Sequence, residues 1–209
     1  MTTDWQAWHG DYADPESALS RRLRVVQQHL DRWLDETAPG AVTVLSACAG
    51  DGRDLVGVLE GRPDAARVRG TLVETDPRST AAARARIGRL SLALDVRETD
   101  AGVSDAYAGG APADLVLLCG IFGNISDDDV ARTIAFAPQL CRPGALVLWT
   151  RHRRAPDLTP RIRGWFTAAG FAEVGFTAPG DGLWSVGACR YDGPPTPLQA
   201  GQRIFTFVR

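Results

Sequence analysis

A chain of 209 residues is long enough for one domain with a substantial core and short for two, and its formal charge of -2 provides no general attraction to nucleic acid or anionic membranes. All 23 residues in the combined lysine and arginine count are arginines, which excludes lysine as a Schiff-base former or general base. The four cysteines are far apart and have no metal-site spacing, so we expect a reduced protein without bound metal.

Residues 1–14 are polar and acidic but include Trp5, Trp8, His9 and Tyr12. Because so many aromatic groups are not expected to stay in water, the segment either packs onto the body of the protein or forms a lid over a substrate. No apolar signal core is present, and no apolar run approaches the ~20 residues of a membrane span. We therefore expect a cytoplasmic protein with neither a membrane nor a nucleic acid as its partner.

A first helix is predicted over residues 16–36. Asp14 is its expected cap and Pro15 lies in its first turn, and apolar residues recur at helical spacing from Leu19 onward. We assign residues 1–38 to a lid segment with this helix and residues 39–209 to the main body, within a single domain.

The rest of the chain alternates short apolar runs with helical patterns. The predicted strands are 41–46, 68–74, 92–97, 114–118 and 145–150, and the predicted helices are 52–60, 77–90, 103–108, one after Ser126, and 158–169. Residues 171–176, 184–191 and 203–208 read as strands without a long helix between them, and the proline-rich stretch 193–197 is expected to connect two strands of a hairpin. This order predicts an α/β fold, a doubly wound, seven-stranded, mostly parallel sheet with an antiparallel C-terminal edge hairpin and helices on both faces.

The stretch AVTVLSACAGDGRDL, residues 41–55, has the pattern of a strand, a tight loop with Gly50 and Gly52, and a helix start. In an open α/β sheet a nucleotide-like ligand binds at such a loop, because small residues let the backbone approach it. A dinucleotide fingerprint would need a third glycine where Leu55 stands, which disfavours a nicotinamide cofactor.

The pattern Ser46-x-Cys48-x-Gly50-x-Gly52 resembles the first motif of class I S-adenosylmethionine-dependent methyltransferases, an acidic residue followed by three alternating glycines. Ser46 stands in place of the acid and Cys48 in place of the first glycine. The larger Cys48 side chain is expected to narrow the pocket near the methionine group of the cofactor.

Three later segments resemble further motifs of this family in the expected order. Glu74 ends the second predicted strand, with Thr75 after it, 24 positions beyond Gly50, where the family has an acid that accepts from both ribose hydroxyls. Asp76 reads more simply as the cap of the next helix. Asp100-Ala101 resembles the acidic-small pair that contacts adenine, although an aspartate here also suits a plain turn. Gly120, Ile121 and Phe122 stand in an apolar loop resembling the motif that lines the methyl-transfer channel.

The resemblance implies S-adenosyl-L-methionine as cofactor, with these binding residues: Ala47, Cys48, Ala49, Gly50, Gly52, Glu74, Thr75, Asp100, Ala101, Gly120, Ile121 and Phe122.

Methyl transfer from a sulfonium needs a general base only where the acceptor must lose a proton. The candidate catalytic residues are His152 after the fifth predicted strand, His9 in the aromatic segment, and Asn124. Asn124 equally suits a loop that closes onto a helix start. The segment Arg151–Arg154 is either an anion clamp for a carboxylate or phosphate, or a solvated loop.

The predicted function is methyl transfer to a small-molecule acceptor, by a monomer or homodimer. The alternatives are cyclisation or elimination on the same cofactor, and a cofactor-binding protein without catalysis.

Overall fold

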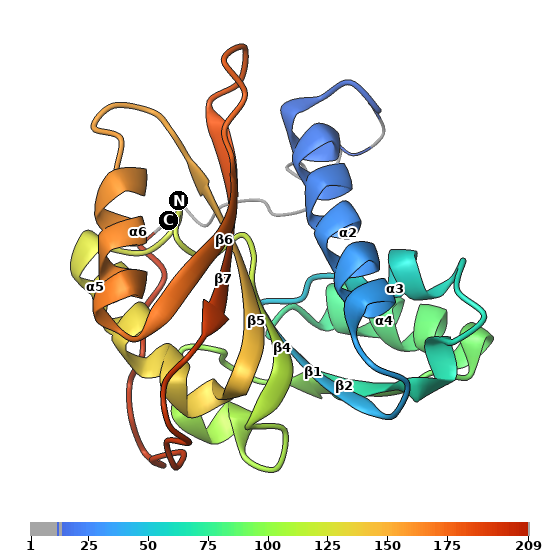
Figure 1. Ribbon diagram of the computed structural model, residues 1–209. Helices are drawn as coiled ribbons and strands as arrows, with labels where there is room; N and C mark the ends of the chain where they lie inside the picture. The colour runs from blue at the N-terminus through green and yellow to red at the C-terminus, as the bar shows by residue number, and fades with distance from the viewer. Residues whose placement is uncertain (1–11, 13, 209) are drawn as a thin grey trace.

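A seven-stranded sheet with the order β3-β2-β1-β4-β5-β7-β6 forms the centre of the protein in the computed structural model, which describes residues 12 and 14–208 (Figure 1). Its strands are β1 (Val42–Ala47), β2 (Val68–Glu74), β3 (Ala93–Glu98), β4 (Ala113–Leu118), β5 (Cys141–His152), β6 (Phe171–Thr177) and β7 (Trp184–Tyr191). Strands β1 to β5 pair in parallel, and β7 pairs antiparallel with both β5 and β6. The predicted doubly wound sheet with an antiparallel edge hairpin is thus confirmed.

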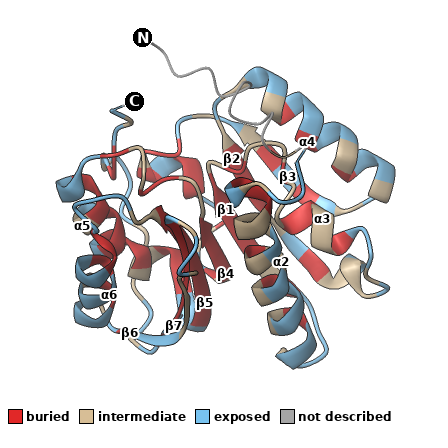
Figure 2. Cartoon of the chain, turned by 90° about the horizontal axis from the view of Figure 1, so that it is seen from above, coloured by how far each residue is buried: buried red, intermediate tan, exposed pale blue. Residues whose placement is uncertain are grey.

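Two layers of helices cover the sheet. The helices are α2 (Ala18–Glu36), α3 (Leu55–Leu59), α4 (Pro77–Leu90), α5 (Asp127–Phe136) and α6 (Thr159–Ala168), with short 3-10 turns at Ala65–Arg67, Ser104–Tyr107 and Ala137–Leu140. Helices α2, α3 and α4 lie on one face and α5 and α6 on the other (Figure 1). Seen from above, the strands are mostly buried between the layers, while the outer helix faces are exposed (Figure 2).

Each face of the sheet has its own hydrophobic cluster. Leu30 of α2 packs with α3 and α4 residues on one side, and Ile134 of α5 and Phe166 of α6 pack around Trp149 on the other. Trp149 and Phe166 stack with their ring centroids 5.9 Å apart. The central strands β1 and β4 are buried on both faces and therefore read as nearly continuous hydrophobic runs, whereas the outer strands β3 and β6 also contain exposed residues.

Local hydrogen bonds move the ends of two predicted helices. Helix α2 begins after Ser17, whose hydroxyl accepts from the Ser20 amide at 3.1 Å, so the expected cap at Asp14 is wrong. Helix α3 is shorter than predicted and begins at Leu55, because the Asp54 carboxylate accepts from the Leu55 amide at 2.7 Å.

The predicted strand over residues 203–208 is wrong. This segment forms only isolated bridges, between Val103 and Arg203 and between Ile125 and Phe207, because it crosses the loops after β3 and β4 and does not run along an edge strand. The hairpin is β6 with β7, so the proline-rich stretch 193–197 follows the hairpin and does not lie inside it.

Candidate functional site

A cavity of about 340 Å³ lies at the carboxyl ends of β1, β2, β3 and β4. Its walls come from the loops after these strands and from the start of α2, with Tyr12, Thr150 and Phe207 completing the lining. Strands β1 and β4 are neighbours whose following chain segments lead to opposite sides of the sheet, and the gap between such strands is where α/β proteins bind ligands.

The loop after β1 forms the floor of the cavity with Cys48, Ala49 and Gly50. Cys48 and Gly50 have left-handed backbone, with φ of 53° and 57°, so the chain turns sharply here. Ala47 and Gly52 were predicted to bind the cofactor, but the described lining does not include them. A Cβ on Gly52 would lie 3.1 Å from Leu72 Cδ2, so this glycine serves close packing of the loop on β2.

Glu74, the last residue of β2, joins two of these loops. One carboxylate oxygen accepts from the Gly50 amide at 2.8 Å, and the other accepts from the Thr75 and Asp76 amides at 2.8 and 2.9 Å. A carboxylate offers about four lone-pair positions, so Glu74 keeps acceptor capacity toward the cavity. Asp76 accepts from the Arg78 amide at 3.0 Å and caps α4, as predicted.

Asp100 and Ala101 line the cavity after β3. Asp100 Oδ1 accepts from the Gly102 amide at 2.7 Å, and Oδ2 pairs with Arg203 Nη1 at 2.5 Å. The Ala101 carbonyl accepts from the buried Tyr107 hydroxyl at 2.6 Å, which fixes the path of this loop. The aspartate therefore shapes its own turn and also faces the cavity.

After β4 only part of the predicted segment reaches the cavity. Gly120 lines it with a φ of 78°, and its amide donates to Thr150 Oγ1 at 2.9 Å. Ile121 and Phe122 have no exposed surface and are outside the described lining, which corrects the expectation that they face the ligand. The left-handed turn at Gly120 sends them into the core, where the Phe122 ring lies 6.1 Å from that of Trp149.

The two candidate catalytic residues that the structure describes, His152 and Asn124, are outside the cavity lining. Asn124 Nδ2 donates to the Gly120 carbonyl at 2.7 Å and so closes the loop after β4. His152 ends β5 opposite Trp184 of β7, close to Gly123. His9 lies outside the described residues, as do Trp5 and Trp8 of the expected lid.

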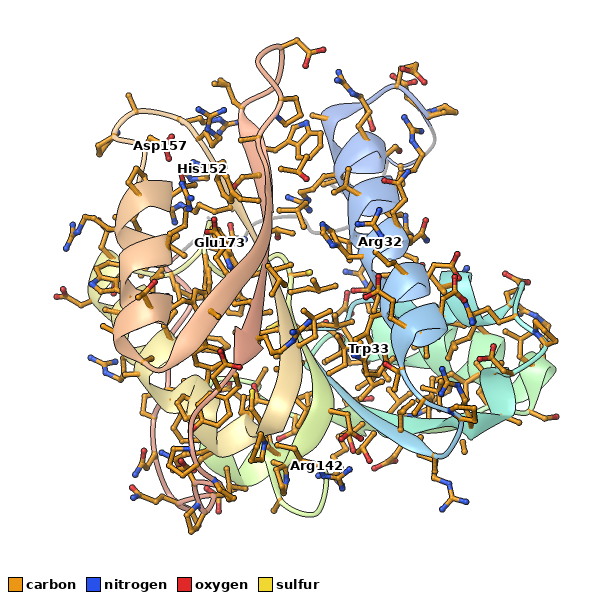
Figure 3. All side chains as sticks on the ribbon, viewed as in Figure 1. Arg32, Trp33, Arg142, His152, Asp157 and Glu173 are labelled. Atoms are coloured by element: carbon orange, nitrogen blue, oxygen red, sulfur yellow. The ribbon has the colours of Figure 1, made fainter. Side chains whose placement is uncertain are left out.

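The cationic segment after β5 does not form the cavity wall. Arg151 is buried and donates to the Phe122 carbonyl, and its guanidinium lies 3.9 Å from Asp127. Arg153 pairs with Asp157 at 3.2 Å. His152 and Asp157 lie near one end of the sheet, and Arg142 of β5 lies at the other (Figure 3). The anion-clamp interpretation of Arg151 and Arg153 therefore has no support from their positions.

The sequence interpretation missed two charged groups that also line the cavity, Arg22 and Asp54. Arg22 of α2 lines the cavity with its cationic side chain, and Val26, one turn further on the same helix face, lines it as well. Asp54 caps α3 and lines the cavity, and burial raises the pKa of its carboxyl to about 6, against the lowering effect of the bond from the Leu55 amide. The one available signal was the i, i+4 spacing of Arg22 and Val26, which does not say what the helix face covers.

The two thiols in the lining are neutral groups. Burial raises the pKa of the Cys48 thiol well above its usual value, and the nearby carboxylates of Glu74 and Asp100 raise it further. Burial also raises the pKa of Cys119. Neither thiol is therefore a thiolate nucleophile at neutral pH.

Among the residues that the structure describes, no group of three or more histidine, cysteine, aspartate or glutamate side chains is arranged to hold a metal ion. Within residues 12 and 14–208, no helix combines the length and the apolar character that crossing a bilayer demands.

No protein-family profile matches the chain, and no curated protein sequence matches it. Among solved structures it is similar to magnesium protoporphyrin IX methyltransferase from Synechocystis with bound S-adenosylmethionine, at 16% identity and a TM-score of 0.66 over 91% of this chain and 92% of that one. It is also similar to 1,6-didemethyltoxoflavin-N1-methyltransferase from Burkholderia thailandensis with bound 1,6-didemethyltoxoflavin and S-adenosylhomocysteine, at 20% identity and a TM-score of 0.64 over 90% and 87% of the two chains.

An O-methyltransferase family protein from Burkholderia thailandensis is similar at 22% identity and a TM-score of 0.61 over 88% of this chain. The chain spans 59% of the length of that protein. These similarities establish that the chain has the Rossmann-like fold of class I S-adenosylmethionine-dependent methyltransferases.

Proposed function

We propose that this protein binds S-adenosylmethionine in the cavity and transfers its methyl group to a small-molecule acceptor. The observation that carries the proposal is the contact of Glu74 Oε2 with the Gly50 amide at 2.8 Å on the cavity wall. It joins a carboxylate that keeps about one of its four acceptor positions free, suited to a ribose hydroxyl, to a turn of small residues that a ligand can approach closely.

The remaining lining suits the two ends of such a cofactor. Asp100 can accept from the amine of adenine while the Ala101 amide donates to the ring. At the other end, Arg22 and Asp54 provide opposite charges, which match the carboxylate and the ammonium of a methionine group. The proposed binding residues are thus Cys48, Ala49, Gly50, Glu74, Thr75, Asp100, Ala101 and Gly120, together with Arg22 and Asp54.

The bound cofactor would supply an activated methyl group on a sulfonium, which is already a good leaving group. This chain's contribution is then to hold the acceptor in line with that methyl and to exclude water. The described lining includes no histidine, so in this proposal the alignment of the acceptor with the methyl group provides most of the rate acceleration. His9 stays a candidate base, and His152 and Asn124 are proposed only to support the loops beside the site.

The acceptor is proposed to be small, and an acceptor with a carboxylate or phosphate stays part of the proposal. Arg53 of the lining is the cation proposed to face such a group, with Asp51 as its partner at 2.7 Å, because Arg22 is assigned to the methionine carboxylate and Arg151 and Arg153 lie outside the described lining. A cytoplasmic location, a monomer or homodimer, and the absence of nucleic-acid and membrane partners remain part of this proposal.

A protein that binds the cofactor without turnover is the second candidate. It is favoured by one observation, the absence of His152 and Asn124 from the described lining. Cyclisation or elimination on the cofactor is the remaining alternative, and the products separate all three.

The test has a binding step and a product step. Calorimetry with S-adenosylhomocysteine should show one site per chain, and incubation with S-adenosylmethionine and a panel of small carboxylates and phosphates should yield S-adenosylhomocysteine. Methylthioadenosine would instead show cyclisation or elimination, and binding without product would show a silent protein. If the full chain binds no S-adenosylhomocysteine, the proposed function is wrong.

A further inference from the structure

The C-terminal segment Gln202–Val208, here called the strap, crosses the loops after β3 and β4. Its Ile204 amide donates to the Gly102 carbonyl at 2.8 Å, and its Val208 amide donates to the Asn124 carbonyl at 2.9 Å. Between them, the Thr206 amide donates to Asp129 Oδ2 at 3.0 Å. The strap is therefore attached at both ends to loops that reach the cavity.

Burial holds the strap in this position. Ile204 and Phe205 are 2% and 1% exposed and belong to the hydrophobic cluster beneath α5 and α6. A Cβ on Gly102 would lie 2.3 Å from the Phe205 carbonyl oxygen, so the loop after β3 and the strap approach as closely as their backbones allow. The strap is thus a fixed wall, whose Phe207 lines the cavity.

Arg203 acts on the cavity through Asp100. Its Nη1 lies 2.5 Å from Asp100 Oδ2, while the Gly102 amide holds Oδ1 at 2.7 Å. With one partner on each oxygen, the carboxylate is fixed in orientation, and each oxygen keeps a further lone pair for a ligand. A carboxylate held in this way accepts a hydrogen bond from a ligand donor. It cannot turn away from a ligand that places an acceptor oxygen against it.

Resting on the proposed function, we infer that the strap is one wall of the nucleobase pocket and that Arg203 is a positioning residue that makes the site selective for an amino-substituted purine. Asp100, oriented by Arg203, accepts from the exocyclic amine of adenine. A 6-oxo purine places an oxygen against the same carboxylate and is rejected, because a site built to accept a donor loses that bond when the donor is replaced.

The selectivity is measured by calorimetry with two probes, S-adenosylhomocysteine and S-inosylhomocysteine, on the full-length chain. The wild type should prefer the adenosine compound, and Arg203→Gln should reduce the ratio of the two affinities about two- to fivefold, the effect of losing an ion pair whose side chains are 49% and 51% exposed. Phe207→Ala should weaken both probes alike and leave the ratio unchanged, because an aromatic face does not distinguish the two bases.

Arg142→Ala is the matched control. Arg142 pairs with Asp114 at 2.8 Å and is as exposed as Arg203, at 47% against 49%, but it lies at the other end of the strands (Figure 3). It should leave both affinities unchanged. Arg203→Met, which keeps the aliphatic stem, is the second variant if Arg203→Gln does not give a cooperative melting transition.

The outcomes separate the two proposals. A wild type that binds neither probe overturns the proposed function. A wild type that binds the adenosine probe but shows the same ratio as the Arg203 variants overturns this inference and leaves the proposed function standing. A ratio that falls in Arg203→Gln or Arg203→Met and stays high in Arg142→Ala supports it.

Discussion

The guanidinium carbon of Arg53 lies 3.9 Å from the ring centre of Tyr12. Arg53 is itself held by Asp51, with its Nε and Nη2 at 2.8 and 2.7 Å from the two carboxylate oxygens. Both Tyr12 and Arg53 line the cavity, and burial raises the pKa of the Tyr12 hydroxyl. The end of the aromatic segment therefore reaches the candidate site through a cation–π contact.

Tyr12→Leu should weaken S-adenosylhomocysteine binding by about 0.5–2 kcal/mol, the usual range for losing a cation–π contact at a partly desolvated site. Calorimetry gives the affinity. Trp165→Leu is the matched control, because its ring lies 4.8 Å from the guanidinium carbon of Arg161 on α6, outside the described lining. Equal losses in the two variants would show that Tyr12 has no particular part in binding.

Removing the Glu74 carboxylate should weaken cofactor binding by about 1.5–3 kcal/mol, because a hydrogen bond to a charged group is lost from a site that cannot replace it. The measurement is calorimetry with Glu74→Ala, together with a melting curve, since three backbone amides also lose their acceptor. Glu98, its register neighbour on β3, is exposed and outside the described lining, so Glu98→Ala should bind normally. Unchanged affinity in Glu74→Ala would remove the ribose assignment.

The parts of the site that the sequence predicts come from strand ends. Glu74 is the last residue of β2, and Asp100 comes two residues after the end of β3. Parallel strands bring their carboxyl ends to one edge of the sheet, so the order of elements predicts that these carboxylates meet the loop after β1. Helix α4 with its Asp76 cap is predictable for a similar reason, since capping depends on neighbours in the chain.

The parts of the site that the sequence does not predict depend on the direction in which the chain leaves a turn and on packing between residues far apart in the chain. After Gly120 a left-handed turn decides that Phe122 enters the core, and no apolar pattern carries that information. Arg22 and Phe207 come from opposite ends of the chain and meet the site only through tertiary packing. Apolar residues dominate 203–208 as in a strand. The Thr206 amide nevertheless donates to the Asp129 side chain and not to a neighbouring strand.

Cys48 occupies a left-handed position, with a φ of 53°, that glycine adopts without strain. Cys48→Gly should therefore be more stable than Cys48→Ala by about 1–2 kcal/mol, since both variants remove the thiol and only glycine relieves the backbone. Urea denaturation of the two variants gives the difference. If alanine is as stable as glycine, the loop does not hold this turn in solution.

Arg151 is predicted to stabilise the fold and not to contact the acceptor. It is 8% exposed and donates to the Phe122 carbonyl, so Arg151→Ala leaves that buried oxygen without this donor and should cost about 1–3 kcal/mol of stability. Arg153→Ala removes a more exposed pair and should cost about 0–1 kcal/mol. Urea denaturation of the two variants measures the two stability losses. An Arg151→Ala protein of normal stability but altered KM for the acceptor would restore the anion-clamp interpretation.

Asp54 should make the ligand-free protein less stable as the pH rises. Burial raises the pKa of its carboxyl from 3.8 to about 6, so between these values the folded state binds more protons than the unfolded state, and stability falls with rising pH. Asp54→Asn should remove this loss, which amounts to about 2–3 kcal/mol when the carboxyl is fully ionised.

The comparison is urea denaturation of the wild type and Asp54→Asn at about pH 4 and about pH 7.5, where the linkage places the carboxyl below and above its folded pKa. The variant should gain stability over the wild type only at the higher pH. Asp51→Asn is the control of opposite sign. Burial alone would raise the pKa of Asp51, but the hydrogen bonds and charge of Arg53, together with the charge of Arg86, lower it. The ionised form of Asp51 therefore stabilises the fold, and Asp51→Asn should be less stable than the wild type at the higher pH. Equal stability of Asp54→Asn and the wild type at both pH values would mean that Asp54 is not buried in the ligand-free protein, and its part in holding a ligand ammonium would then lose its basis.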